Sequence, residues 1–157
     1  MTIIIETPKG SHKKFKYDQR QEKFTVHKIL PGSMVFPFDF GFVPQTRGDD
    51  GDPLDIVILS KSIHPTGTHL NSRIIGCLPA KQTDLKGTTI RNDRFVGVPD
   101  DAGDYSDIHS LEQVPEETIS NIQSFFISYL SAENKQVVFL PILNNRQATQ
   151  LLQLSKA

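Results

Sequence analysis

The sequence predicts a mainly β fold with α-helices near its C-terminal end, an α+β arrangement that starts with a small barrel or sandwich. Short apolar runs separated by Gly, Pro and Asp turns recur from residue 3 to residue 98, which is typical of an all-β segment. Apolar residues recur at helical spacing only after Pro115. These two patterns together predict the fold class.

The early elements follow from local patterns. The β-branched run 3–5 predicts a first strand, with Glu6 at its edge. Residues 15–17 and 24–29 predict a hairpin with a basic face, and alternating apolar residues predict that its second strand is half-buried. The aromatic stretch 35–42 is expected in the core, although its proline argues against a central strand there.

The later elements complete the order. Further strands are expected at residues 54–59, 72–78 and 94–98, with a loop at 84–88. Pro115 fits a first helical position, and apolar residues then recur at helical spacing: Ile119, Ile122, Phe126 and Tyr129 or Leu130. A late strand is expected at 136–140, and an amphipathic helix at about 145–154.

Length and composition indicate one domain over residues 1–157, because the chain is too short for two domains of ordinary size. Hydrophobic residues make up 37% and charged residues 22%, which is typical of a soluble globular chain. No apolar run approaches the roughly 20 residues of a membrane span, so no membrane association is expected. The single cysteine, Cys77, is expected in the core; it excludes an intrachain disulfide and favours the cytoplasm.

The strongest functional signal is a turn with four aspartates before an apolar strand: Asp49, Asp50, Asp52 and Asp55. Hard cations such as Mg²⁺ prefer oxygen ligands, and a bound cation would relieve the repulsion between these carboxylates. Gly51 permits a positive φ and Pro53 fixes the next bend, so the turn can direct neighbouring carboxylates toward one point. The spacing does not fit an EF-hand, and the cluster precedes its strand, unlike the Asp-x-Asp of aspartyl-phosphate phosphatases.

The charge pattern indicates an anionic partner with a metal rather than nucleic acid. Residues 1–30 carry seven basic and three acidic side chains, and the aspartates follow. A basic segment folded against an acidic one can hold a cation beside a polyanion. A net charge of −1 and the acidic turn argue against nucleic acid. Four cations are expected to be solvated surface residues: Lys9, Lys13, Arg20 and Lys23. The histidines lack paired spacing, so they are expected in turns or on the surface and no zinc site is predicted.

Residues 50–56 match at every position the signature Asp-small-Asp-Pro-apolar-Asp-apolar, and the chain thereby resembles the family I inorganic pyrophosphatases. Nearly the whole chain carries further landmarks of that family: Glu6 and Pro8, Lys14, Met34-x-Phe36-Pro37-x-x-Phe40-Gly41-Phe42, Val96-Gly97-Val98-Pro99 and Phe125-Phe126-x-x-Tyr129. The resemblance implies a five-stranded OB-like β-barrel flanked by two C-terminal helices. It also implies an inorganic diphosphatase that hydrolyses pyrophosphate with Mg²⁺, and a homo-oligomer.

The resemblance assigns roles to individual residues. Asp52 would accept a proton from the attacking water. The phosphate-binding group would consist of Lys14, Lys28, Arg94 and Tyr129. The metal positions would be Asp50, Asp55, Glu6, Asp84 and Asn92.

Several positions depart from the family pattern. Lys28 stands for an arginine, Arg94 for a lysine, Lys16 for a glutamate and Leu130 for a lysine, while Phe36 and Phe40 replace two tyrosines. In a longer loop, Asp84 and Leu85 align with an acidic pair and Asn92 aligns with a metal-binding aspartate. Asp93 is expected to point to the opposite face unless a bulge realigns it. These changes predict weaker Mg²⁺ binding or fewer ions, and reduced activity.

Two other functions remain open at this stage. The chain could hydrolyse another phosphoanhydride with the same machinery, since several departures lie on the substrate side. It could also be a non-catalytic relative that binds phosphate, a nucleotide or a partner protein, because a fold does not fix a function. The retained Asp50, Asp52 and Asp55 favour an enzyme.

Overall fold

The centre of the computed structural model, which describes residues 1–100, 103 and 105–157, is a closed five-stranded barrel. Its strands follow the order β1-β4-β5-β9-β6, and pairing of β1 with β6 closes it. They are β1 (Thr2–Thr7), β4 (Asp39–Val43), β5 (Leu54–Ile58), β9 (Arg94–Pro99) and β6 (His69–Leu78). The short β11 (Leu143–Asn144) pairs with β6 outside the barrel. The predicted mainly β fold with an OB-like barrel is confirmed.

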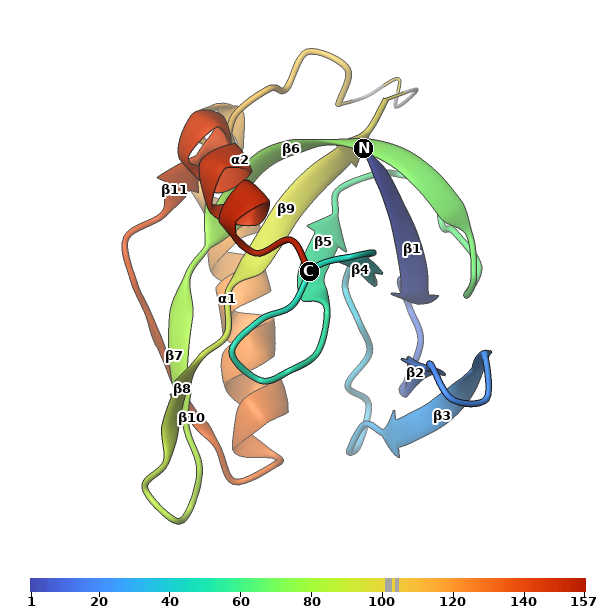
Figure 1. Ribbon diagram of the computed structural model, residues 1–157, viewed down its shortest axis with the longest axis vertical. Coiled ribbons are helices and arrows are strands. Elements are labelled where there is room, and N and C mark those ends of the chain that lie inside the picture. The colour runs from blue at the N-terminus through green and yellow to red at the C-terminus, as the bar shows by residue number, and fades with distance from the viewer. Residues whose placement is uncertain (101–102, 104) are drawn as a thin grey trace.

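Two smaller sheets project from one end of the barrel, on opposite sides (Figure 1). One is the hairpin of β2 (Lys13–Asp18) and β3 (Lys23–Ile29). The other has the order β10-β7-β8, formed by β10 (Gln136–Phe139), β7 (Ala80–Thr83) and β8 (Thr89–Arg91). These projections extend the barrel beyond the ends of its own strands.

Both predicted helices are present and each seals one apolar cluster. Helix α1 (Glu116–Ser131), preceded by the 3-10 turn η1 (Leu111–Gln113), buries Phe125 and Phe126 against Phe36 and Phe38. Helix α2 (Asn145–Leu154) packs along β6, and its Ala148 and Leu152 are buried in the second cluster with Ile3 and Ile56. Asn144 caps α2 by accepting a hydrogen bond from the Gln147 N–H. Each fully buried phenylalanine contributes about 1.5–3 kcal/mol of transfer free energy.

Strand pairing places the polar residues of the fold. A Cβ at Gly41 would lie 2.1 Å from the Ile4 carbonyl oxygen, so only glycine permits the close approach of β4 to β1. Strand β4 then positions β5, in which Asp55 lies opposite Phe42. Strand β5 pairs in parallel with β9, and this register puts Asp55 opposite Arg94. The barrel thereby brings a carboxylate and a guanidinium together.

One local prediction was wrong, and two strands were missed. Strand β3 is mostly exposed rather than half-buried, with Ile29 68% exposed, because the hairpin stands apart from the barrel and pairs only with itself. Strands β7 and β8 were not expected. The predicted loop at 84–88 is present as the tip of the hairpin that they form. The two strands were missed because this segment is polar and lacks the alternating apolar residues that indicate a strand.

Other predictions hold. The four phenylalanines at 36, 38, 40 and 42 are buried, and β4 begins only after Pro37. Cys77 is fully buried, and burial raises the pKa of its thiol. His64 lies in a loop but is not a free surface residue, because its Nδ1 lies 2.7 Å from a carboxylate oxygen of buried Asp39. Among the described residues, no helix is both long and apolar enough to cross a membrane.

Candidate active site

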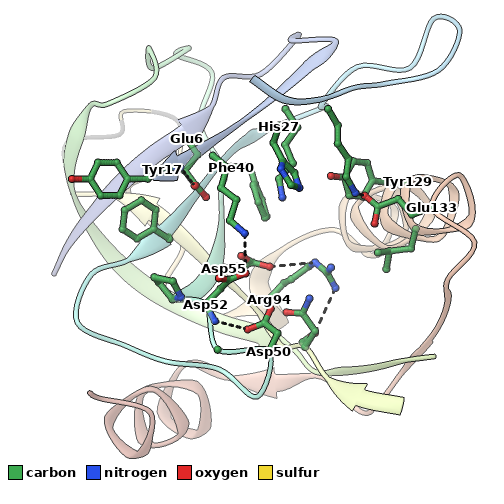
Figure 2. A pocket seen from close by; sticks show the side chains of 18 of the residues that line it. Glu6, Tyr17, His27, Phe40, Asp50, Asp52, Asp55, Arg94, Tyr129 and Glu133 are labelled. Carbon is green, nitrogen blue, oxygen red and sulfur yellow. Dashed lines mark hydrogen bonds and ion pairs between the residues drawn. The ribbon is translucent and has the colours of Figure 1, made fainter. Parts of the chain in front are cut away.

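A cavity of about 640 Å³ opens between the β2–β3 hairpin, the aspartate turn, helix α1 and the start of β9. It is lined by nine of the ten residues expected in the site: Glu6, Lys14, Lys28, Asp50, Asp52, Asp55, Asn92, Arg94 and Tyr129. Figure 2 shows the three aspartates grouped beside Arg94, with Tyr129 and Glu133 across the cavity on the α1 side. Segments far apart in sequence therefore meet in one cavity.

The aspartate turn is held by its own backbone. Gly51 has a φ of 86°, the left-handed conformation expected for this position. The Asp52 N–H donates to Asp50 Oδ1 at 3.0 Å, and the Gly48 N–H donates to the Asp52 carbonyl at 2.8 Å. Buried Thr46 fixes the base of the turn, because its Oγ1 accepts from the Leu54 N–H. The turn is therefore ordered before any ligand arrives.

Asp55 and Arg94 form the floor of the cavity. Arg94 Nε lies 4.0 Å from Asp55 Oδ2, and the guanidinium stacks on the Phe126 ring at 4.1 Å from its centroid. Burial raises the pKa of the Asp55 carboxyl, and the charge of Arg94 opposes this effect. Burial likewise lowers the pKa of Arg94, against the effect of Asp55. Arg94 is only 3% exposed.

Two buried donors at the cavity have no hydrogen-bond partner among the described residues: Arg94 Nε, which lies 4.0 Å from Asp55 Oδ2, and Tyr129 Oη. Burial raises the pKa of the Tyr129 hydroxyl, so it stays protonated and can donate a hydrogen bond. Buried polar groups nearly always have partners, and one left unsatisfied carries a cost in free energy. Both groups are therefore positioned to donate to a bound ligand.

Three lysines reach the cavity from the hairpin, and each makes different contacts. Lys14 Nζ lies above the rings of Phe40 and Tyr129, at 5.7 and 6.0 Å from their centroids. Lys16 Nζ lies 3.1 Å from Asp52 Oδ2. Lys28 forms an ion pair with Glu133, which follows α1. The predicted folding of the basic segment against the acidic turn is confirmed, and the four cations expected on the surface are exposed.

Glu6 reaches the cavity through a β-bulge. The register of β1 with β4 shifts between Ile5 and Thr7, which redirects the side chain between them. Glu6 Oε2 accepts a hydrogen bond from the Tyr17 N–H at 2.9 Å. Burial raises the pKa of this carboxyl to about 7, and the Tyr17 hydrogen bond only partly opposes the shift.

The tenth expected residue, Asp84, does not line the cavity. It lies at the tip of the β7–β8 hairpin, where its Oδ1 accepts from the N–H groups of Lys86 and Thr88. Leu85, aligned with a second acid, is 81% exposed beside it. Placing Asp84 in the site was wrong, because the added residues form a hairpin tip that carries it away from the barrel.

Gln82 also lines the cavity, and it was missed from the sequence. It is 6% exposed, and its Oε1 accepts from Asn92 Nδ2 at 3.2 Å. Asp93 stays outside the cavity lining, because its Oδ1 accepts from the Ala80 N–H and from Arg91 Nε. The wall formed by β7 and the start of β9 thus presents two neutral amides. A period-two reading of residues 80–82 would have indicated that Gln82 points inward.

Glu133 and Lys135 were also missed. They follow the end of α1, where Asn134 adopts a φ of 62°, and both line the cavity. Glu133 Oε2 lies 3.6 Å from Lys135 Nζ, so this carboxylate contacts Lys135 as well as Lys28. No motif marks this short loop, and only the fold brings it to the hairpin.

The carboxylates line one wall and do not enclose a single point. Within the described part of the chain, no three His, Cys, Asp or Glu side chains converge closely enough to hold an ion among them. The expectation that the turn directs its carboxylates toward one point is therefore not met. An ion here would have few protein ligands, with water filling its other positions.

Comparison with known proteins identifies the family. A family model described as inorganic pyrophosphatase matches residues 3–157. The chain belongs to the inorganic pyrophosphatase family. It is 34% identical over 139 residues to an inorganic pyrophosphatase of Methanosarcina acetivorans, which covers 88% of this chain and 80% of that protein. It is 31% identical over 153 residues to soluble inorganic pyrophosphatase 5 of Arabidopsis thaliana, covering 98% and 68% of the two chains.

Solved structures of inorganic pyrophosphatases share this fold. The enzyme from Helicobacter pylori matches with a TM-score of 0.89 at 26% identity, covering 99% of this chain and 90% of that chain. The enzyme from Thermus thermophilus matches with a TM-score of 0.88 at 28% identity, covering 99% and 88%. The family and fold predicted from the sequence are both confirmed.

Proposed function

We propose that this chain hydrolyses inorganic pyrophosphate to two phosphates, with Mg²⁺ as its cofactor. The observation that carries the proposal is the meeting of the three aspartates with Lys14, Arg94 and Tyr129 in one cavity. Arg94 Nε and Tyr129 Oη, which have no hydrogen-bond partner among the described residues, would be satisfied by phosphate oxygens. Family membership supports the same activity.

The residues present fit a hard divalent cation. Asp50 and Asp55 offer carboxylate oxygens, and Asn92 offers a neutral oxygen on the facing wall. Mg²⁺ typically takes one or two carboxylates and keeps several waters, so this donor set is sufficient. Buried Glu6, whose pKa is raised to about 7, would gain a counter-charge from an ion bound nearby. When bound, Mg²⁺ supplies acidification of a coordinated water and neutralisation of phosphate charge.

Asp52 is the proposed proton acceptor. Its side chain lies between the turn and the hairpin, and the hydrogen bond from its N–H to Asp50 Oδ1 fixes the backbone that carries it. A carboxylate in this place orients the attacking water and accepts its proton as the bond to phosphorus forms. This role requires the ionised form of Asp52.

The cations bind the substrate and stabilise its charge. Lys14 has no carboxylate at ion-pair distance among the described residues, so its ammonium is free to contact an anion. Arg94 offers Nε from the floor, and Tyr129 donates its hydroxyl from α1. Lys28 stays near the same anion while paired with Glu133. Charge that develops on the departing phosphate would be stabilised by these groups.

The proposed enzyme is a single domain, located in the cytoplasm and assembled as a homo-oligomer. One domain over residues 1–157 is supported by a family match that covers nearly all of them. A cytoplasmic location is supported by the single, buried cysteine. A homo-oligomer remains a prediction from the resemblance, and light scattering on the eluting protein would test it. A single-chain mass would contradict the assembly without affecting the proposed reaction.

The test is phosphate release from pyrophosphate over a range of Mg²⁺ concentrations. We expect Mg²⁺-dependent turnover that falls about 10²- to 10⁴-fold in Asp52→Asn, as is typical for loss of a general base. The matched control is Asp49→Asn, which removes the same charge from an exposed neighbour outside the cavity and should stay within about twofold of the parent. A folded parent protein with no more turnover than Asp52→Asn would overturn the proposal. Tripolyphosphate and nucleoside triphosphates, assayed in parallel, would then reveal another anhydride substrate.

A further inference from the structure

Lys16 lies on the carboxylate that performs the proposed proton transfer. It extends from β2 across the cavity, and its Nζ lies 3.1 Å from Asp52 Oδ2, which joins residues 36 positions apart. Both side chains are partly exposed at the cavity, at 39% and 49%. The ammonium therefore lies directly beside a carboxylate oxygen of Asp52.

The other hairpin lysines do not share this arrangement. Lys14 rests over aromatic rings and Lys28 pairs with Glu133 beyond the acidic turn. Only Lys16, among the described cavity residues, forms an ion pair with the turn from the hairpin side. Its ammonium has three N–H groups, so two remain for water or substrate oxygen after one binds Asp52.

The facing wall offers little charge to hold a second ion. Gln82 and Asn92 are neutral and hydrogen-bonded to each other at 3.2 Å, and the carboxylate of Asp93 is bound to Arg91 outside the cavity. A divalent ion next to Asp52 would meet the positive charge of Lys16 on one side and amides on the other. The charges present thus favour an ion at Asp50 and Asp55, and disfavour one at Asp52.

We propose that Lys16 is a resident cation that takes the place of a divalent ion at Asp52 and lowers the number of metal ions this site binds. The inference rests on the proposed function, since it concerns which positive charges in the same cavity balance the aspartates and the anionic substrate. The ammonium holds the Asp52 carboxylate in place through their ion pair, and it presents positive charge to the incoming anion without a second metal. Lys16 is therefore a specificity-determining residue for metal content.

The experiment counts bound Mn²⁺ without substrate, from the electron paramagnetic resonance signal of the free ion. We expect Lys16→Glu to bind one more Mn²⁺ per chain than the parent. Lys16→Gln removes the cation without adding a ligand, so it should also gain this ion but bind it about tenfold more weakly than Lys16→Glu does, because it lacks the added negative charge. The matched control is Lys13→Glu, because Lys13 lies on the same strand but is exposed and outside the cavity. Circular dichroism confirms that each variant is folded.

Equal Mn²⁺ number and affinity in the parent and Lys16→Glu would overturn the inference. An equal gain in Lys13→Glu would also overturn it, because the effect would then reflect net charge alone. The failure of the proposed function is a separate result, read from pyrophosphate turnover of the parent. Turnover with unchanged Mn²⁺ binding in Lys16→Glu removes the role of Lys16 and leaves the function standing.

Discussion

Two walls of the same cavity differ in how they are built and in the charge they carry. The aspartate turn is one continuous segment with carboxylates at Asp50, Asp52 and Asp55, closed by its own backbone hydrogen bonds. A second wall joins β7 to the start of β9 and presents the amides of Gln82 and Asn92. One wall thus keeps the charge that a metal needs, and the other has oxygen atoms without charge.

This difference shows which parts of the site tolerate change. In the turn, each carboxylate position depends on its neighbours through Gly51 and the Asp50–Asp52 hydrogen bond, so one substitution disturbs the others. On the amide wall, Gln82 lies on β7, which pairs with β8 and β10, and Asn92 lies between β8 and β9, where its N–H donates to the Ala80 carbonyl. Amides can replace acids there without disturbing the backbone. We therefore expect activity to depend most on the turn and metal affinity to be adjustable from the other wall.

The largest expected effect is the loss of a carboxylate from the acidic wall. Asp55→Asn should lower kcat/KM about a thousandfold, because charge stabilisation in a buried site is often worth about 3–4 kcal/mol. Asp93→Asn is the matched control, since it removes an equal charge near Arg94 but outside the cavity. Its kcat/KM should remain within about threefold of the parent. Steady-state assays of both variants decide the point, and equal losses would show that the charge near Arg94 matters more than the wall.

Substitution of Glu6 tests whether a buried carboxylate at the cavity destabilises the folded chain when no metal ion is bound. The folded-state pKa of its carboxyl is about 7, against an ordinary value of 4.5, so the folded state holds the proton more tightly. Ionisation of Glu6 therefore lowers the free energy of unfolding as the pH rises from about 4.5 to 7. Above pH 7 this destabilisation reaches its full size. In EDTA, Glu6→Gln should be more stable than the parent at pH 8, by at most about 3 kcal/mol, and the gain should largely vanish at pH 4.5.

Urea unfolding at both pH values measures this difference. Glu112→Gln removes an exposed carboxylate and should give no pH-dependent gain. A constant difference between Glu6→Gln and the parent at pH 4.5 and 8 would show that Glu6 ionises normally in the folded chain. Added Mg²⁺ should reduce the gain at pH 8 if an ion supplies the counter-charge to Glu6.

Adding charge to the amide wall should strengthen metal binding. Asn92→Asp places a carboxylate in the cavity that Asp50 and Asp55 also line, and we expect Mn²⁺ affinity to rise about tenfold. Gln82 can accommodate the change by donating its amide N–H to the new carboxylate. Asn121→Asp, on the exposed face of α1, adds the same charge outside the cavity. Titration calorimetry with equal affinities for the two variants would contradict the assignment of this wall.

The same contrast explains what the sequence could and could not predict. The turn was predictable because its residues lie within one short stretch and their chemistry follows from spacing alone. Lys14, Arg94 and Tyr129 required the resemblance, since nothing local connects them. Gln82 and Glu133 were missed because strand pairing and a loop after α1 bring them in, and the polar segment 80–91 lacks the apolar alternation that reveals a strand.

The smallest expected effect is that of replacing Asp84, which the sequence alignment places at the metal and the structure places at a hairpin tip. Asp84 was expected at the metal, yet its Oδ1 only accepts two backbone N–H groups at the hairpin tip. Asp84→Asn keeps that acceptor, so Mn²⁺ affinity should stay within about twofold and the free energy of unfolding within about 0.5 kcal/mol. Gln82 lies two residues before Asp84, on β7, and lines the cavity. Gln82→Glu should therefore tighten Mn²⁺ binding severalfold. If Asp84→Asn weakened binding and Gln82→Glu did not, the hairpin tip would have to fold over the cavity. Asp84 would then be the acid at the metal ion that the alignment expected.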